Sequence, residues 1–342
     1  MEHLAIDLGG RESQVCVRSA DGQIVEERRW ATRDLGTYLR GRGHSRVVIE
    51  ACAEAFFVAD EARKCGHEVR VVAATLVRSL GVGARRTKTD KRDARALSEV
   101  SCRIDLPSVH VPSADARQLK TQLGMRHALV RSRTMLINTV RGWLRGQAIG
   151  IRKSAEAFTQ RVRESFGAML LPSYVERQLS MIDELSKQIE AADQELAKLA
   201  KTSAVCPRLM SVPGVGPITA LQFVAVIDEL ARFDSAHRVE AYLGLTPGEH
   251  SSSEKVRRTS ITKAGSTAMR WCLVQAAWAA RRARGKHAMI DWAVEVQKRR
   301  GKKVAAVALA RKLAGILFAI WRDGTVYDPH NASRPVLGPA AA

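Results

Sequence analysis

The apolar stretch His3-Leu-Ala-Ile-Asp7 ends on an acidic residue, and Arg46-Val-Val-Ile-Glu50 does the same further along the chain. Short continuous apolar runs are typical of buried strands. Between them, residues 13–18 alternate between polar and apolar, and the Asp21-Gly22 turn leads into residues 23–30, so a three-stranded antiparallel meander is predicted. Acids at the ends of two buried strands indicate a polar site at one edge of the sheet.

The rest of the first 112 residues alternates between helix and strand. After the meander we expect helix, strand, helix, strand, a basic segment and a helix, over residues 34–40, 46–50, 54–64, 67–72, 78–88 and from Asp90 onward. This order of elements predicts an α/β domain with a ribonuclease H-like fold over residues 1–112, closed by Pro107 and Pro112.

Two further acids, Asp90 and Asp93, lie three residues apart in the predicted helix and therefore share one of its faces. In the predicted fold the first and fourth strands are neighbours, so Asp7 and Glu50 would converge at one edge. Four carboxylates at that edge suit Mg²⁺, which prefers carboxylate, water and phosphate oxygens.

Taken singly, each of these acids has a simpler explanation. Asp90 fits a helix cap or first-turn acid, and Asp93 fits an ion pair with Lys91, Arg92 or Arg95. The arrangement of all four in the predicted fold favours the metal site.

The chain has 342 residues, with 55 Lys+Arg against 35 Asp+Glu and a formal net charge of +20. Such a chain attracts polyanions, and nucleic acid is favoured because each phosphate contact releases a condensed counterion. A membrane surface is the competing polyanion, but no apolar run approaches the roughly 20 residues that span a bilayer. Two or three domains are expected at this length.

The start of the chain lacks a basic region followed by a cleavage site, so we expect a cytoplasmic protein. Six scattered cysteines form no C-x-x-C pair, which favours buried free thiols in a reducing compartment over a zinc site.

Residues 113–205 are predicted to be helical and to form a coiled-coil region. A continuous helix is expected over 113–146, with Ser113 as its N-cap. This helix is rich in cations, which either lie along a nucleic-acid backbone or form a solvated face. They are Arg117, Lys120, Arg126, Arg131, Arg133, Arg141 and Arg145, against the single acid Asp115.

A second helix after Pro172 has a heptad register, which predicts coiled-coil packing against the first helix or against a second subunit. Its core positions are Val175, Gln178, Ile182, Leu185, Ile189, Ala192, Leu196 and Leu199, of which only Gln178 is polar.

Residues 206–330 are predicted to form a mainly helical domain. Within it, Leu209-Met-Ser-Val-Pro-Gly-Val-Gly-Pro-Ile-Thr-Ala220 matches a helix-hairpin-helix turn, in which Gly214 and Gly216 would let backbone amides approach a phosphate. The alternative is a glycine-rich corner between helices with no ligand. The chain from Asp328 is expected to be loose, with a flexible tail over residues 331–342.

The run Ser251-Ser252-Ser253 follows His250 and is interpreted as a loop. Nearby cations would hold a phosphate beside a serine hydroxyl; they are Lys255, Arg257, Arg258 and Lys263. A serine needs a base or a metal to become a nucleophile, and a metal bound by the acidic domain would provide that activation.

Several of these segments together resemble the insertion sequence 110 family of DEDD transposases. They are Ala5-Ile-Asp-Leu-Gly9, Val48-Ile-Glu-Ala51, Thr87-Lys-Thr-Asp-Lys-Arg-Asp-Ala-Arg95, Val212-Pro-Gly-Val-Gly-Pro217, Gly244-Leu-Thr-Pro247, the serine run and Thr262-Lys-Ala-Gly265. The resemblance covers nearly the whole chain.

The resemblance implies a RuvC-like N-terminal domain, a coiled-coil middle and a C-terminal transposase domain. It implies a site-specific recombinase of double-stranded DNA, which in some members is guided by a structured RNA. Because such an enzyme has to hold two duplexes, we expect a dimer or tetramer, with the heptad helix as the oligomerisation element. Asp7, Glu50, Asp90 and Asp93 become the Mg²⁺-binding acids. Ser252 becomes the nucleophile, with a 5′-phosphoserine type of intermediate; because Ser253 replaces the family's usual glycine, Ser251 stays a second candidate.

Three other functions remain open at this stage. A Holliday-junction nuclease would use the same acids to activate water, and a non-catalytic nucleic-acid binder would need neither acids nor serines. Asp7-Leu-Gly-Gly10 also looks like the first phosphate loop of actin-like sugar kinases, but its imperfect repeat at Asp34-Leu-Gly-Thr37 comes too soon for a second lobe.

Overall fold

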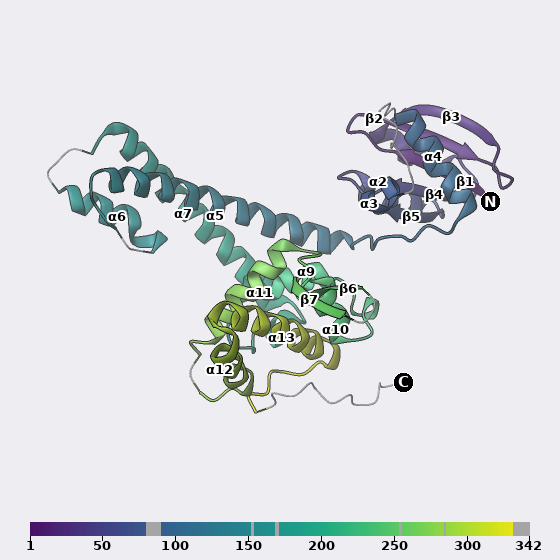
Figure 1. Cartoon of the computed structure of the whole chain (residues 1–342). Helices are drawn as coiled ribbons and strands as arrows, with labels where there is room; N and C mark the ends of the chain where they lie inside the picture. The colour runs from purple at the N-terminus through teal and green to yellow at the C-terminus, as the bar shows by residue number, and fades with distance from the viewer. Residues whose placement is uncertain (80–89, 152–153, 168–170, 253–254, 284, 331–342) are drawn as a thin grey trace. The chain divides into compact units, whose positions relative to one another are not determined.

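The computed structural model describes residues 1–79, 90–151, 154–167, 171–252, 255–283 and 285–330 (Figure 1). The side chains of residues 78–79, 90, 250–252 and 255–258 lie outside the described part. So do Ser253, most of the basic segment 78–88 and the predicted tail 331–342. The chain divides into two compact units between Pro112 and Ser113.

The first unit is an α/β domain, as the sequence predicts. Its elements are β1 (Glu2–Asp7), β2 (Glu12–Arg18), β3 (Ile24–Ala31), η1 (Thr32–Asp34), α1 (Leu35–Arg40), β4 (Ser45–Glu50), α2 (Ala55–Lys64), β5 (Glu68–Val72), α3 (Ala74–Ser79) and α4 (Asp90–Arg103). They form one mixed sheet with the strand order β3-β2-β1-β4-β5. The first three strands pair antiparallel, while β4 runs parallel to β1 and β5 parallel to β4.

Helices cover both faces of this sheet. Successive side chains of a strand point to opposite faces, so alternate residues enter different cores. Leu4, Ile6 and Ile49 pack under α1 and α2. Ala5 and Val48 belong to the opposite core with α4. This alternation decides which face the strand-end acids share.

The second unit is mainly helical. Its elements are α5 (Ala114–Gly146), α6 (Ala155–Phe166), α7 (Ser173–Thr202), α8 (Cys206–Leu209), α9 (Pro217–Ile227), η2 (Leu230–Arg232), α10 (Ala236–Tyr242), β6 (Pro247–Ser252), β7 (Lys255–Ile261), α11 (Thr267–Ala280), α12 (Ala288–Arg300) and α13 (Lys302–Asp323). The predicted cap of α5 is confirmed, because the Ser113 side chain accepts a hydrogen bond from the Ala116 amide.

Helix α7 packs along α5 of the same chain (Figure 1). The heptad period is present, but its second row of core positions is one residue later than predicted. Leu179 and Ala200 are fully buried, whereas the predicted core residue Leu199 is 42% exposed. From Val175 the buried positions are spaced by four residues and then by three, whereas the prediction spaced them by three and then by four.

Two of the predicted nucleic-acid cations on α5 lie in this seam instead. The Arg126 guanidinium donates hydrogen bonds of 2.7 and 2.9 Å to Asp193, and Arg133 donates one of 3.3 Å to Ser186. Their side chains are only 16% and 13% exposed. The interpretation of the whole cation row as a nucleic-acid face is therefore wrong for these two residues, since they hold α7.

The centre of the C-terminal core is formed by α9, α11 and α13. By length and composition α13 would suffice to cross a membrane, which a search for uninterrupted apolar runs misses because Arg311 and Lys312 lie in its middle. In this structure Leu309, Leu313 and Leu317 are fully buried, as expected for the core helix of a globular domain.

The chain on both sides of Asp328 is held to the domain. The Ala288 amide donates a 3.0 Å hydrogen bond to the carbonyl of Pro329, and the Tyr327 amide donates one of 2.9 Å to Ser211. The prediction of a loose segment from Asp328 is thus wrong for its first residues, because backbone contacts that no local pattern reveals hold it to the domain.

Candidate functional site

Asp7 and Glu50 end two neighbouring parallel strands. The register pairs Ile6 with Ile49, so the two acids follow side by side at the same edge of the sheet. They have the same strand parity as Ala5 and Val48, which pack toward α4. Both acids are therefore on the sheet face that α4 covers.

Asp93, on α4, lies at the same level along the sheet as Asp7 at the end of β1. At the other end of this helix, Ser101 forms a 2.9 Å hydrogen bond with His3 at the start of β1. Eight residues of helix span ~12 Å, and the four residues from His3 to Asp7 span ~13 Å of strand. Asp93, which is only 7% exposed, thus lies on the helix at the level of Asp7 on the strand.

Asp90 is the first residue of α4 and precedes Asp93 on the same helical face. Among the side chains that the structure describes, no group of three or more His, Cys, Asp or Glu stands close enough to hold a metal ion. The topology gathers the acids on one face without forming a finished ligand set from the described side chains.

Helix α4 is anchored to the sheet by charge as well as by its apolar face. Glu27 on β3 accepts two hydrogen bonds from the Arg95 guanidinium and forms a 3.4 Å ion pair with Lys91. The hydrogen bonds from Arg95 hold the pKa of Glu27 below its ordinary value. Lys91 and Arg95, which were considered as partners of Asp93, thus pair with Glu27.

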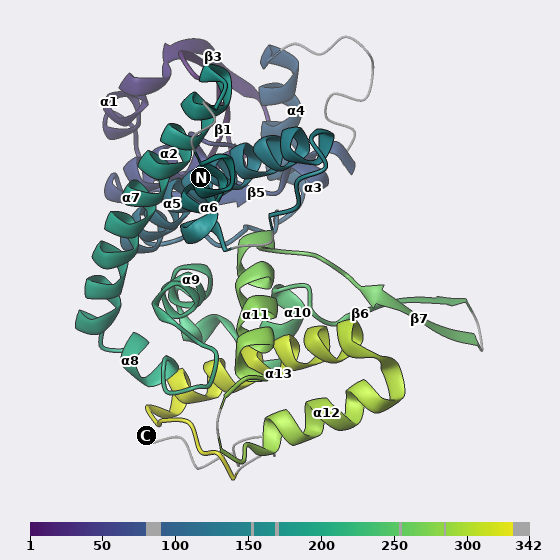
Figure 2. The ribbon, with the colours of Figure 1, turned by 90° about the vertical axis from the view of Figure 1, so that its left-hand side faces the viewer.

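Ser251 and Ser252 belong to a β-hairpin and not to a loop. Strand β6 pairs antiparallel with β7, so that Ser252 is opposite Lys255 and Ser251 is opposite Val256. Figure 2 shows this hairpin extending from the helical domain. The loop interpretation is wrong for Ser251 and Ser252, because backbone pairing with β7 holds both in a strand although serine is not among the residues enriched in strands. Ser253 lies outside the described residues.

Register separates the two candidate serines. Residues directly opposite each other, and residues two apart along a strand, share a face of a hairpin. Ser252 therefore shares its face with His250, Lys255 and Arg257. Ser251 falls on the other face, opposite Val256.

The base of the hairpin is a clasp made by two segments that are distant in sequence. Gly244 has a φ of +68°, and an added Cβ would lie 2.2 Å from the carbonyl oxygen of Ala264. Gly265 has a φ of +67°, and its Cβ would lie 2.1 Å from the carbonyl oxygen of Tyr242. The Thr262 amide also donates a 2.9 Å hydrogen bond to the Thr246 carbonyl. Glycine is required at both positions because the two backbones touch.

Two models of known protein families match this chain. The model of the Transposase IS116/IS110/IS902 family matches residues 206–291, which contain the hairpin and its clasp. A second transposase model, that of the DEDD transposases of IS110, matches residues 4–148, which contain the four acids.

Individual relatives match over most of their length. A putative transposase of Sinorhizobium fredii is 31% identical, over 89% of this chain and 80% of its own. A probable family 20 transposase of Pseudomonas aeruginosa is 30% identical, over 96% and 99%. The transposase for insertion sequence element IS1111A of Coxiella burnetii is 28% identical, over 93% and 88%.

The chain belongs to the IS110 family of transposases. It is accordingly an enzyme of insertion-sequence DNA recombination, and the family implies DNA as its substrate and a divalent metal ion as its cofactor. The sugar kinase and the non-catalytic binder are both excluded by this membership.

One residue of the transposase's clasp escaped the sequence analysis. Arg270 donates hydrogen bonds to the carbonyls of Leu243, Ala264 and Gly265, and so ties both segments of the clasp to α11. The sequence contains one sign of its role, because Arg270 is the one charged residue in the otherwise largely apolar α11.

The predicted helix-hairpin-helix glycines divide into two kinds. Gly214 has a φ of +83°, and its Cβ would lie 2.2 Å from the Ala276 carbonyl and 2.6 Å from the Ala280 amide. Close packing on α11 therefore explains Gly214, as in a corner without a ligand. Gly216 precedes α9 with open space beside it, so the amides at that helix start remain a candidate phosphate contact.

Proposed function

We propose that this transposase cuts and rejoins DNA with two half-sites carried by different domains. Asp7, Glu50, Asp90 and Asp93 form the divalent-cation half in a RuvC-like domain, and Ser252 is the nucleophile of the other half. The observation that carries the proposal is the placement of Asp7, Glu50 and Asp93 on one sheet face beneath α4.

Strand order supports a ribonuclease H-like assignment of residues 1–112. Three antiparallel strands followed by two parallel ones, in the order β3-β2-β1-β4-β5, match the arrangement expected of that fold. In such a sheet β1 and β4 are neighbours, which is what brings two of the acids together. Residues 113–205 then form the coiled-coil region, and 206–330 the transposase domain.

In the proposed reaction the phosphodiester bond of the DNA is exchanged for a phosphoserine bond, so that rejoining needs no outside source of energy. The Ser252 oxygen attacks the phosphorus of a DNA strand; the bond from oxygen to phosphorus forms, and the bond to the 3′ oxygen breaks. The serine proton passes to a base, and the departing strand leaves as a 3′-hydroxyl. A 3′-hydroxyl of the recombining strand then attacks the phosphoserine, which rejoins the DNA and restores the serine.

The donor set fits a hard cation such as Mg²⁺, because four carboxylates supply only oxygen ligands. When bound, the cation would polarise the scissile phosphate. The protein's own part is to present these carboxylates from two packed strands and one anchored helix.

Ser252 is preferred over Ser251 because of its position on the hairpin. It shares a face with His250, the titratable base nearest to it in register, and with two cations suited to a phosphate. Lys263, at the clasp, is an additional candidate for the DNA backbone. Ser251 lies opposite an apolar residue.

Two further parts of the proposal concern partners. Joining two DNA duplexes calls for more than one subunit, and we propose a dimer or tetramer. We also propose that a structured RNA directs the choice of DNA site. RNA that co-purifies with the protein and changes its DNA specificity when exchanged would support this; a nuclease-treated protein with unchanged specificity would contradict it.

The decisive experiment traps the covalent intermediate. Nicked double-stranded DNA and Mg²⁺ should give a protein–DNA adduct with the wild type and with Ser251→Ala, but none with Ser252→Ala. Peptide mapping of the adduct then identifies the serine. A water-using junction nuclease would instead cleave equally well in both variants and form no adduct.

A further inference from the structure

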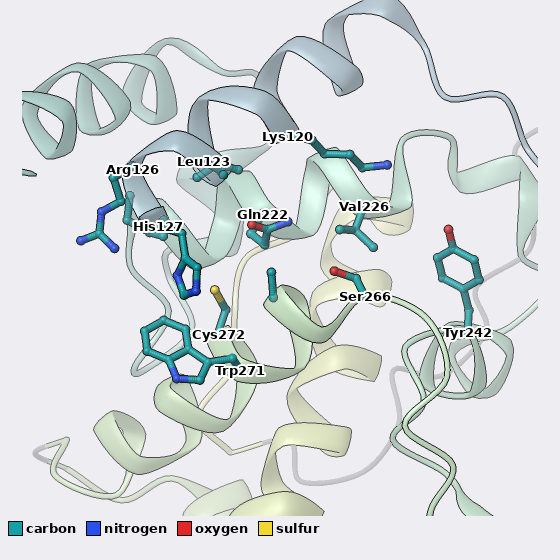
Figure 3. A pocket seen from close by; sticks show the side chains of 13 residues that line it. Lys120, Leu123, Arg126, His127, Gln222, Val226, Tyr242, Ser266, Trp271 and Cys272 are labelled. Atoms are coloured by element: carbon teal, nitrogen blue, oxygen red, sulfur yellow. The ribbon is translucent and has the colours of Figure 1, made fainter. Parts of the chain in front are cut away.

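A hollow of about 400 Å³ lies in the second unit among α5, α9, α10 and α11, apart from the hairpin serines (Figure 3). Residues from all four helices line it, among them Lys120, His127, Gln222, Tyr242 and Trp271. Its volume lies within the usual range of small-ligand sites. The question is what it accommodates.

Gln222 is the most informative residue of its wall. It is only 8% exposed and belongs to α9, a helix made almost entirely of apolar side chains. Within the part of the chain that the structure describes, its side-chain amide makes no hydrogen bond to protein, and it lines the hollow. The Gln222 oxygen and nitrogen are not among the polar atoms that are fully buried without a partner, so the amide is open to the hollow. It can therefore both donate hydrogen bonds to a ligand there and accept them.

Aromatic rings stand at both sides of the same hollow. Trp271 is 46% exposed although it lies on a core helix, and its ring contacts His127 with centroids 5.7 Å apart. Tyr242, which is 37% exposed, lies at the other side (Figure 3). Large exposed rings beside a cavity are suited to stacking on a flat ligand.

A larger groove of about 1380 Å³ continues from the hollow along α5. The two share His127, Ala268 and Trp271, and the groove extends past Arg131. Lys120 lies at the far side of the hollow. None of the described residues lining either space is an Asp or Glu, so their charge favours a polyanion.

We propose that this hollow receives one unpaired base of a single-stranded nucleic acid, whose backbone follows the groove along α5. Gln222 would hydrogen-bond the edge of the base, Trp271 would stack on it, and Arg131 would face the phosphates. A base in a duplex is stacked and paired, so it would have to be unstacked before it reached this depth. The inference deepens the proposed function, because strand exchange passes through single-stranded segments.

The test measures binding of short oligonucleotides to the full-length protein. Single-stranded DNA and single-stranded RNA, each with one 2-aminopurine, and the matched duplex are titrated, with fluorescence anisotropy and base quenching as readouts. We expect a single strand to quench on binding and the duplex not to. The strand type that binds more tightly identifies the source of the base.

Two variants and a matched control make the test specific. Trp271→Ala should weaken single-strand binding by roughly 5- to 140-fold, which corresponds to the loss of one base-stacking aromatic. Gln222→Leu should weaken it as well, without lowering the thermal unfolding midpoint, since the lost amide makes no hydrogen bond to the described part of the protein. Trp278→Ala, on the same helix and 36% exposed but outside the hollow, should change nothing.

Equal affinities for wild type, Trp271→Ala and Gln222→Leu would overturn the inference, as would equal base quenching in duplex and single strand. Adduct formation on nicked duplex is measured in parallel. If the adduct forms without single-strand quenching, only this inference fails. If quenching occurs without an adduct, only the proposed serine chemistry fails.

Discussion

The acidic edge and the serine hairpin are held in place by different physics. The acids extend from two central strands and from a helix packed on them, so the burial of a whole core determines their positions. Ser251 and Ser252 lie at the far end of a two-stranded hairpin, and an isolated hairpin is marginally stable in water. The position of the serines therefore depends on the clasp at its base. The acidic half should respond mainly to changes in its carboxylates, and the serine half to changes far from the serines.

The largest effect is expected at the acidic edge. Asp93→Asn keeps the shape of the side chain but removes its charge, so DNA cleavage and adduct formation should fall by about 10²- to 10³-fold, the usual loss when one preorganised electrostatic group is removed. The fold should persist, as judged by thermal unfolding. Glu99→Gln, an exposed acid of the same helix, is the control and should retain activity. An active Asp93→Asn would remove this residue from the cation site.

The next effect tests the clasp. Gly244→Ala adds a Cβ that would lie 2.2 Å from the Ala264 carbonyl, so the hairpin should shift. Because small displacements of a reacting group are costly, we expect the adduct yield to fall on the order of 10²-fold although no serine is changed. Gly22→Ala has a similar φ of +85° but meets nothing within 4 Å. That control should lose about 1 kcal/mol of stability and no activity.

If Gly244→Ala left the adduct yield unchanged, the hairpin would not depend on its base, and the contrast between the two half-sites would fail. Equal losses in both glycine variants would point to a general cost of backbone strain instead.

The smallest effect concerns the anchor of α4. Glu27→Gln removes the charge that pairs with Lys91 and Arg95, so amide hydrogen exchange in α4 should accelerate at neutral pH. The pKa of Glu27 is lowered in the folded state, so its stabilisation is fully present above the ordinary value near 4.5 and is lost as pH falls through the folded-state pKa. The difference between wild type and variant should therefore shrink in acid. A difference that persisted unchanged at low pH would mean that charge does not anchor this helix.

Much of the acidic half could be predicted from the sequence. Strand ends, the i and i+3 spacing of Asp90 and Asp93, and the order of elements are local signals, and the observed strands and helices follow them. The shared face of Asp7 and Glu50 follows from alternation once the strands are known. Much less of the serine half was predictable. The clasp joins the segments around Gly244 and Gly265, and no pattern in either segment predicts that it contacts the other.

The same limit explains why Arg126, Arg133 and Gly214 were misassigned. From the sequence alone, Arg126 and Arg133 are predicted to be surface charges, because nothing near them in the chain indicates their partners on α7. The motif around Gly214 predicts a phosphate contact, but the structure shows that Gly214 packs directly against α11. Gln222 attracts no notice in a sequence, and only its burial in the wall of a hollow makes it informative.

The sequence by itself determined the family, the α/β and helical halves, and the residue types available for chemistry, because periodicity, spacing and charge are properties of short segments. Only the tertiary structure decided which of these residues are neighbours. It placed Asp93 on α4 at the level of Asp7, and it assigned Arg126 to the packing of α7. It also put Ser251 and Ser252 into a hairpin whose base needs glycine at positions 244 and 265, where two backbones touch. The physical reason is that close packing joins residues distant in sequence, and each such contact depends on both partners at once.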